Sequence, residues 1–442
     1  MGRMILMTAS LIALAACTQQ DQPQDQAQGN AVTAAPTDAT AALHAAAADP
    51  RLAHFYESQN WHTVWTAQTE ADLMRALGTA EQHALDKDAF VHPIEAAREP
   101  AAHDAALTLA ALTFAEALAH GRTDPARIRA HYTVPRPGAD VAAGLATAIA
   151  HGNVAQWIAG LAPQDAEYRL LSQAYVQYNH QAAAALAQPE GSPARRAAGV
   201  PIERARTLAV NLERRRWLER TPPATRIDVN TAATMLTYWR DGQAADTRRV
   251  IAGEVGRETP ELGSPLYRLV ANPTWTVPHS IQDEVSSPAY MARHHMTMRN
   301  GFVVQQPGPT NSLGLVKFDL QNDQQIYLHD TPAKGVFSRS DRHASHGCVR
   351  VFDALGFAQM LATDAGVLDA WNAARATGDE TFVPLPHPIP VRLMYMTAYV
   401  ENGRIVFVRD AYGWDEDVAE ALGLAARPRQ TGPGTPVNDL GP

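Results

Sequence analysis

One cysteine is the clearest candidate for chemistry in this chain. Cys348 lies in the segment Ser345–Arg350, which reads Ser-His-Gly-Cys-Val-Arg. The chain has one other cysteine, Cys17, close to its start. A thiol that has no internal partner either pairs with another molecule or is kept for a reaction. At the ordinary pKa of about 8.5 a thiol is mostly protonated at neutral pH, so a nucleophilic cysteine needs an imidazole or another positive charge nearby.

Two histidines lie close enough in sequence to serve Cys348. His346 is two residues before it, and His329 is 19 before it (348 less 329). Apolar and polar residues alternate over 326–329, so Tyr327 and His329 share one face of the expected strand. If the apolar pair faces the core, these two polar side chains face a cleft or solvent, where a base could act.

The residues around Cys348 suit an activated thiol. Gly347 permits close backbone approach, and we expect amide groups at the start of a following helix to lower the thiol pKa and to stabilise an oxyanion. The alternative for a cysteine next to a histidine is a buried structural residue.

The N-terminus gives Cys17 a separate role. A basic residue, Arg3, precedes an apolar run over 4–13 and small residues before Cys17. This pattern is typical of a lipoprotein signal peptide, here residues 1–16, and the run is shorter than the roughly 20 residues of a membrane span. The alternative is an ordinary secretory signal with an incidental cysteine. Thr18, rather than aspartate, follows Cys17, which favours a lipid-anchored periplasmic protein held at the outer membrane.

The charge balance bears on the partners. Removal of residues 1–16 takes Arg3 from the 37 Lys and Arg and none of the 46 Asp and Glu, which leaves 36 against 46. This acidic surplus argues against nucleic acid as a partner. Stability must come from packing, because an acylated Cys17 leaves no internal disulfide.

The first part of the chain after the signal divides in two. Residues 17–50 consist mainly of Gln, Asp, Ala, Pro and Thr, which predicts a disordered tether. Residues 51–221 show helical periodicity and predict a helical scaffold domain. A C-cap at Gly121 and an N-cap at Asp124 mark helix ends within it, and the stretch 188–201 predicts a loop.

A change of period near residue 222 begins a second domain, predicted over 222–415. Short alternating runs and turn residues predict a mostly β structure with a helix over 355–364. The stretch 272–300 has no clear period and predicts an ordered functional loop, a candidate lid. Residues 416–442 form a predicted C-terminal tail. The fold class is therefore α+β, with a helical N-terminal domain followed by a mostly β domain.

The chemical residues resemble a known family. His329 followed by Ser345-His346-Gly347-Cys348 resembles the signature of the L,D-transpeptidases (YkuD-type catalytic domain). The resemblance extends to the segments 327–332, 272–278 and 311–314. It is greatest to the large periplasmic branch, which has a helical N-terminal domain and a capping loop.

The resemblance implies roles for the site residues. Cys348 would be the nucleophile and His329 its proton-transfer partner. The oxyanion and substrate would be bound by a further set of residues: Tyr327, Gly347, His346, Arg350 and Ser345. The amide of Cys348 itself would join that of Gly347 at the oxyanion. Structural roles for His346 and Arg350 remain equally open.

The family's substrates are peptidoglycan stem peptides, cut after the third residue. The implied reaction passes through a thioacyl enzyme, which a stem diamino acid, a lysine of an outer-membrane protein, a free D-amino acid or water resolves. It requires no cofactor. No metal is expected either, because the spacing of four histidines matches no trusted ligand pattern: His279, His294, His295 and His343.

The sequence departs from the branch in two ways. The interval 188–221 is too short for a separate peptidoglycan-binding domain, so wall binding is expected of the helical region, the lid or the anchor. Ala344 stands where relatives tend to have a bulkier residue. Alternative functions are an L,D-carboxypeptidase, a papain-like cysteine peptidase, in which the cysteine precedes the histidine, and a catalytically silent wall-binding lipoprotein.

Overall fold

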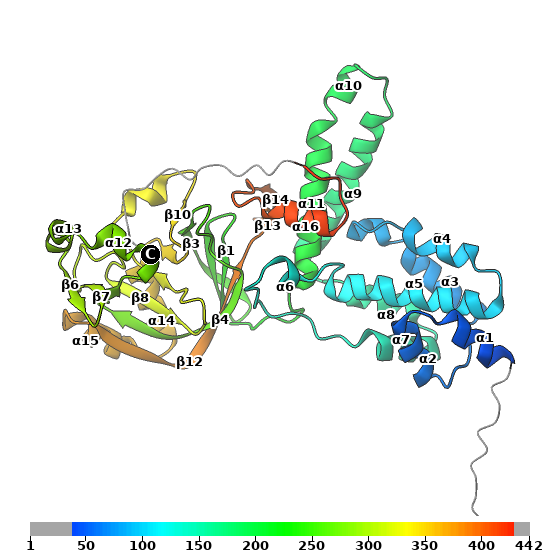
Figure 1. Ribbon diagram of the computed structural model, residues 1–442, viewed down its shortest axis with the longest axis horizontal. Helices are drawn as coiled ribbons and strands as arrows, with labels where there is room; N and C mark the ends of the chain where they lie inside the picture. The colour runs from blue at the N-terminus through cyan, green and yellow to red at the C-terminus, as the bar shows by residue number, and fades with distance from the viewer. Residues whose placement is uncertain (1–37, 428–442) are drawn as a thin grey trace, which may run out of the picture.

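The computed structural model describes residues 38–427, and it consists of a helical region followed by a β-rich domain (Figure 1). The helices of the first region are α1 (Asp38–Ala46), α2 (Pro50–Ser58), α3 (Ala67–Leu77), α4 (Asp88–Ala96), α5 (Pro100–His120), α6 (Pro125–Ile128), α7 (Val141–His151), α8 (Val154–Leu161), α9 (Ala166–Leu186), α10 (Pro193–Arg196) and α11 (Gly199–Trp217), with a 3-10 turn, η1 (Ala80–His83). The predicted α+β class is confirmed.

Helix α5 is the centre of the helical region. Its apolar stripe, which includes Leu107 and Phe114, is buried among the surrounding helices. The predicted caps are confirmed: α5 ends at Gly121, whose φ is +86°, and the Asp124 carboxylate accepts a hydrogen bond from Ala126 N at the start of α6. A side chain at Gly121 would collide with Glu213 of α11, so this turn also lets two helices approach closely.

Two predictions for the helical region need correction. Residues 38–50 are not a tether, because α1 forms there and buries Leu43 in the core around α5. The rest of the predicted tether and the predicted signal lie outside the described residues. The predicted loop 188–201 contains α10, and α11 already begins at Gly199, so α9, α10 and α11 form a hairpin that projects from the molecule (Figure 1).

The β-rich domain is built on a nine-stranded sheet in the order β10-β3-β11-β9-β8-β4-β12-β1-β2. Its strands are β1 (Arg226–Asn230), β2 (Met235–Arg240), β3 (Gln243–Gly253), β4 (Leu262–Ala271), β8 (Val316–Leu320), β9 (Leu328–His329), β10 (His343–Ser345), β11 (Val349–Val351) and β12 (Thr381–Met394). The long strand β3 pairs with β2 through its first half and with β11 through its second, so the sheet closes on itself.

The inner face of this sheet packs on two helices, α14 (Ala354–Asp364) and α15 (Leu368–Ala376). Ile326 and Leu328 point into this core, as the alternation predicts. The outer face of the same strands is therefore left for Tyr327 and His329. A 3-10 turn, η2 (Lys334–Ser338), lies between β9 and β10.

The stretch 272–300 is a small folded unit rather than an irregular loop. It contains β5 (Trp275–Thr276), α12 (His279–Val285), α13 (Pro288–Arg293) and β6 (Met296–Arg299), and β7 (Phe302–Gln305) completes a three-stranded sheet. Its own core includes Trp275, Val285 and Met296, and Tyr327 packs against that core. We call residues 272–305 the cap.

The end of the described chain returns to the helical region, which corrects the predicted boundary at 415. Strand β12 ends at Met394, and the hairpin of β13 (Ala398–Glu401) and β14 (Arg404–Phe407) packs on α9 and α11 rather than joining the main sheet. Helix α16 (Trp414–Ala421) then lies on α11, held by ion pairs such as Arg206–Glu416 at 2.6 Å. Residues 416–424 are thus part of the fold and not a tail.

No helix within residues 38–427 is both long and apolar enough to cross a membrane.

Candidate active site

Cys348 lies between β10 and β11, and its side chain is almost fully buried. The sulfur contacts the carbonyl oxygen of Gln325 at 3.8 Å. Burial raises the pKa of the thiol from an ordinary value of about 8.5–9.0 to about 11, because a thiolate loses more hydration than a neutral thiol does. The expectation that a following helix would lower this pKa is wrong, since strand β11 intervenes and α14 begins only at Ala354.

Several groups favour the thiolate against this burial. The largest of these effects is a hydrogen bond from the backbone amide of Tyr327, followed by the charge of Lys317, the Tyr327 hydroxyl and the charge of Arg350. They reduce the cost of an anion at the sulfur without removing it. The raised pKa therefore favours the neutral thiol over the thiolate.

His329 is placed to receive a proton. Strands β9 and β11 run parallel, with Val349 opposite Leu328 and Arg350 opposite His329. The imidazole is fully buried, and its Nδ1 lies 2.5 Å from the carbonyl oxygen of Asp330. Because a carbonyl can only accept, Nδ1 must carry the proton, and in the neutral ring the basic lone pair is on Nε2.

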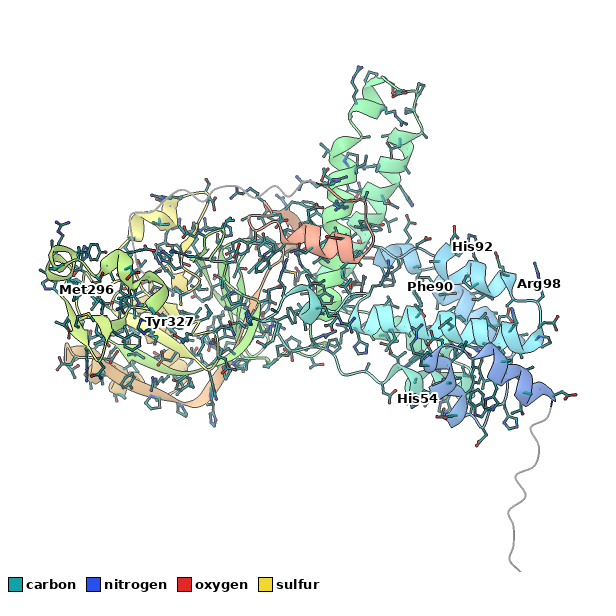
Figure 2. All side chains as sticks on the ribbon, in the orientation of Figure 1. His54, Phe90, His92, Arg98, Met296 and Tyr327 are labelled. Atoms are coloured by element: carbon teal, nitrogen blue, oxygen red, sulfur yellow. The ribbon has the colours of Figure 1, made fainter. Side chains whose placement is uncertain are left out.

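Tyr327 stands beside both groups. Its ring meets the His329 ring edge-on with centroids 5.7 Å apart, and the Lys317 Nζ lies 4.3 Å from the centre of the tyrosine ring. Burial, and then the neighbouring Cys348, raise the pKa of the Tyr327 hydroxyl well above its usual range, so the hydroxyl keeps its proton and can donate it to an anion. Figure 2 labels Tyr327 in the β-rich domain, together with Met296 of the cap.

The loop that carries Cys348 is held from within by Ser345. The fully buried Ser345 Oγ donates to the Cys348 carbonyl at 2.6 Å and accepts from Gly347 N at 3.3 Å. Ser345 therefore holds the loop in shape through hydrogen bonds within it. Gly347 has a φ of +118°, which a side chain would strain, so glycine is required at the turn into Cys348.

A second layer supports this loop from behind. Thr259 Oγ1 donates to the Gly347 carbonyl at 2.8 Å and accepts from Gly253 N at 2.9 Å. The hydroxyl of Tyr412, which comes from the segment before α16, donates to the Gly253 carbonyl at 2.7 Å. The segment that packs on the helical region thus also reaches the support of the cysteine loop.

His346 connects the loop to the cap. Its Nε2 lies 4.0 Å from a carboxylate oxygen of Glu254, and Glu254 lies 3.7 Å from the guanidinium of Arg257. Arg257 in turn pairs with Glu284 of α12 at 3.2 Å. This series of contacts runs from the cysteine motif to the cap.

Arg350 braces the site and does not reach outward. Its side chain is fully buried on β11, directly opposite His329 and next to Ile251 of β3. Of the two roles expected for it, the structure therefore favours bracing over contact with substrate.

The other motif segments fix the surroundings. The Asn272 amide donates to carbonyl groups within residues 374–379 at 3.2–3.4 Å, and the Asn311 amide donates to the cap carbonyls of Pro273 at 3.0 Å and Gln305 at 3.4 Å. Gly314 has a φ of +63° and lies so close to the Asp330 carboxylate that a side chain would overlap it. These residues hold the cap and the strand of His329 in place.

The sequence reasoning missed three residues. Lys317 of β8 lies opposite His329 of β9. The alternation of buried and half-buried residues in β8 places Lys317 on the outer face, and this alternation could have been recognised in the sequence. Thr259 and Tyr412 carry no local signal, because each is remote in sequence from Cys348. Among residues 38–427 no group of three or more His, Cys, Asp or Glu side chains is arranged to hold a metal ion.

Parts of this chain are similar to known proteins. Residues 224–383 match the family model of the L,D-transpeptidase catalytic domain (YkuD), and residues 50–175 match the model of a scaffold domain. A putative L,D-transpeptidase of Haemophilus influenzae is 33% identical over 219 residues, which cover 43% of this chain and 45% of that protein. The chain thus spans less than half the length of this relative.

Two solved structures show a more distant similarity. The L,D-transpeptidase from Mycobacterium smegmatis is 15% identical, with a TM-score of 0.21 over 39% of this chain and 60% of that chain. A cysteine-to-serine variant of the Enterococcus faecium L,D-transpeptidase is 13% identical, with a TM-score of 0.21 over 32% and 47%. Residues 224–383 of this chain are thus similar in sequence to the L,D-transpeptidase catalytic domain of the YkuD type.

Proposed function

We propose that the protein is a peptidoglycan L,D-transpeptidase that acts through a thioacyl intermediate on Cys348. The observation that carries the proposal is the pairing of β9 with β11, which brings His329 beside the cysteine turn, with Nδ1 held by the Asp330 carbonyl. The family of the catalytic domain supports the same reaction class.

In the first half-reaction, Cys348 Sγ attacks the carbonyl carbon of the third stem residue while its proton passes to Nε2 of His329. The carbonyl oxygen becomes an oxyanion, to which the Tyr327 hydroxyl donates. Collapse of this intermediate breaks the peptide bond, and His329 returns the proton to the nitrogen of the leaving D-alanine. The product is a thioester on Cys348.

In the second half-reaction, an acceptor amine attacks the thioester and gives its proton to His329. The thiolate leaves and takes that proton back, which restores the neutral thiol. A stem diamino acid, a lysine of an outer-membrane protein or a free D-amino acid each supplies such an amine. Water in the same position would make the enzyme an L,D-carboxypeptidase.

We further propose that the protein is a periplasmic lipoprotein, attached through Cys17 and sorted to the outer membrane. The apolar run and small residues before Cys17 support this location. The Cys17→Ser variant should then lose the lipid mass and leave the membrane fraction. A wild-type protein without lipid on Cys17 would contradict the anchor but leave the catalytic proposal standing.

The catalytic proposal is tested by mass spectrometry of the products formed from tetrapeptide-stem muropeptides. Wild type should release D-alanine and form cross-linked products, and Cys348→Ala should form neither. His329→Ala should be strongly impaired, whereas His387→Ala, which alters an exposed histidine of β12, serves as the matched control. Product formation by Cys348→Ala would refute the nucleophile, and D-alanine release without cross-links would indicate the carboxypeptidase.

A further inference from the structure

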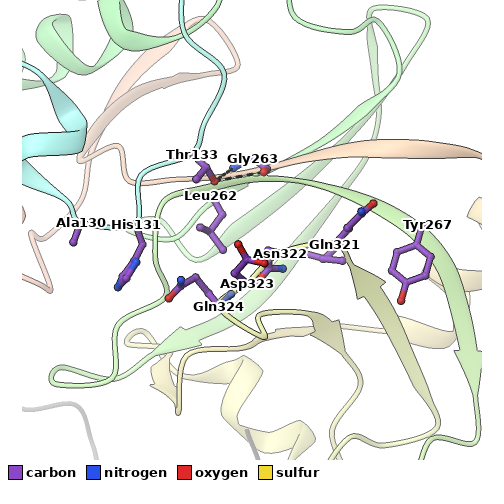
Figure 3. Close-up of a pocket in the computed structure, with 11 residues that line it drawn as sticks. Ala130, His131, Thr133, Leu262, Gly263, Tyr267, Gln321, Asn322, Asp323 and Gln324 are labelled. Carbon is purple, nitrogen blue, oxygen red and sulfur yellow. Dashed lines mark hydrogen bonds between the residues drawn. The ribbon is translucent and has the colours of Figure 1, made fainter.

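A large open crevice lies where the helical region meets the β-rich domain. Its volume is about 840 Å³, within the range of roughly 300–1,000 Å³ that is typical of ligand sites. One wall comes from residues 130–133 after α6, and the other from β4 and from the loop 320–324 after β8. Figure 3 shows the side chain of His131 on the first wall and those of Asp323 and Gln324 on the second.

The two walls are fixed to each other at one end of the crevice. Thr133 N donates to the Glu261 carbonyl at 3.2 Å, and Gly263 N donates to Thr133 Oγ1 at 3.2 Å. A side chain at Gly263 would lie 2.7 Å from the Thr133 carbonyl oxygen, so only glycine permits this approach. The crevice is therefore a built feature of the domain junction.

The lining is polar but carries little charge. It includes His131, Gln321 and Gln324, together with the ring of Tyr267, and contains no lysine or arginine. Over the described residues 38–427, these four side chains form no hydrogen bond with the rest of the protein, so their donors and acceptors are available to a ligand. A strongly anionic ligand would need cationic partners, whereas amides, an imidazole and an aromatic ring suit a neutral ligand rich in hydroxyl and amide groups.

The crevice shares a loop with the reaction centre. Asn322, at the crevice wall, donates to the Ile326 carbonyl at 2.8 Å and accepts from Ile326 N at 3.1 Å. The next residue after Gln324 is Gln325, whose carbonyl oxygen contacts the sulfur of Cys348. A ligand held by residues 321–324 therefore lies on the segment that leads directly to Cys348.

We propose that this crevice binds the saccharide backbone of peptidoglycan, and that it thereby presents an attached stem peptide to Cys348. This inference rests on the proposed function for the identity of the polymer. The backbone is a chain of N-acetylated amino sugars that is neutral where stem peptides are attached, whereas the free stem ends in carboxylates. A lining with one carboxylate, Asp323, and no lysine or arginine accordingly favours the saccharide over the peptide.

The direct test is a calorimetric titration of the full chain carrying Cys348→Ala with a peptide-free tetrasaccharide of N-acetylated amino sugars. The double variant Gln321→Ala/Gln324→Ala should raise the Kd about tenfold, the change expected when two hydrogen bonds are lost. Gln243→Ala, which alters an exposed glutamine at the β2–β3 turn, should bind as before. No binding of the tetrasaccharide, or an equal Kd in the double variant, would overturn the inference.

A kinetic comparison in the Cys348-containing protein separates this inference from the proposed reaction. In the double variant, the ratio of kcat/KM for glycan-linked stems to kcat/KM for free tetrapeptide should fall about tenfold. If the protein binds the saccharide but shows no turnover, the saccharide site stands and the proposed reaction is refuted. If it shows turnover but does not bind the saccharide, the reaction stands and the saccharide site is refuted. Binding of free tetrapeptide in the crevice would show that the crevice is a peptide site and would refute the saccharide site.

Discussion

The buried thiol makes a quantitative prediction about reactivity. With a pKa of about 11 rather than 9.0, Cys348 has roughly one hundredth of the thiolate at pH 7 that an exposed cysteine would have. Its alkylation by a small neutral reagent should therefore be about 100-fold slower in the folded protein than in the same protein unfolded in urea, since the thiolate is the reactive form. The Cys17→Ser variant isolates the signal of Cys348.

The pH profile of that reaction decides between two resting states. A neutral thiol predicts a rate that rises about tenfold per pH unit up to roughly pH 10. A thiolate already paired with imidazolium predicts a plateau above pH 7 instead. A plateau in wild type that disappears in His329→Ala would refute the reasoning, because it would show that the ion pair exists before substrate arrives.

The same difference in pKa must appear as stability. Folding raises the pKa of this thiol, so its contribution is fully present below pH 9 and is lost as the pH rises towards 11. Between pH 8 and 10.5 wild type should lose about 2 kcal/mol more than Cys348→Ser, measured by urea unfolding. Equal losses in the two proteins would mean that burial does not penalise the thiolate.

Three substitutions test the elements that hold the site. Tyr412→Phe removes the hydroxyl that supports the cysteine loop from behind, so the free energy of unfolding should fall by about 1 kcal/mol and kcat should fall with little change in KM. The control is Tyr238→Phe, which removes a hydroxyl that donates to Asp364 and should leave kcat unchanged. Gly347→Ala forces a side chain onto a φ of +118° and should cost about 1–3 kcal/mol in thermal unfolding; an unchanged Tm would remove the case for strain. Arg214→Ala leaves the Asp415 carboxylate of α16 without its buried partner, so the free energy of unfolding should fall by about 3–5 kcal/mol. The control Arg127→Ala, which breaks an exposed ion pair, should lower it by less than about 1 kcal/mol. Equal effects of the two substitutions would show that the buried pair does not hold α16.

Features that depend on near neighbours in the chain could be predicted from the sequence. The alternation over 326–329 placed Leu328 in the core and His329 on the opposite face, and Gly121 marked the end of α5. The pair of Cys348 and His329 could also be predicted, because a short stretch of chain, which contains η2 and β10, separates the neighbouring strands β9 and β11.

Features that depend on distant packing could not be predicted. The tether was extended too far because few apolar residues occur there, yet burial of Leu43, with Ala46 packed beside it, anchors α1 to the core. Nothing near Tyr412 indicates that its hydroxyl meets Gly253, 159 residues away. The pKa of Cys348 was expected to fall because helix amides were counted and burial was not, and burial has the larger effect.

The return of the chain after β12 has a consequence for biosynthesis. The hairpin β13–β14 and helix α16 pack on α9 and α11, so the helical region is completed by residues that follow the β-rich domain. During translation the helical region is synthesised first. The surface of α9 and α11 is covered only when roughly the last thirty described residues have been made. Tyr412 arrives with the same segment, so the support behind the cysteine loop is completed last. A chain that ends at Met394 and has been released from the ribosome should therefore hold a formed sheet and a loosely positioned thiol.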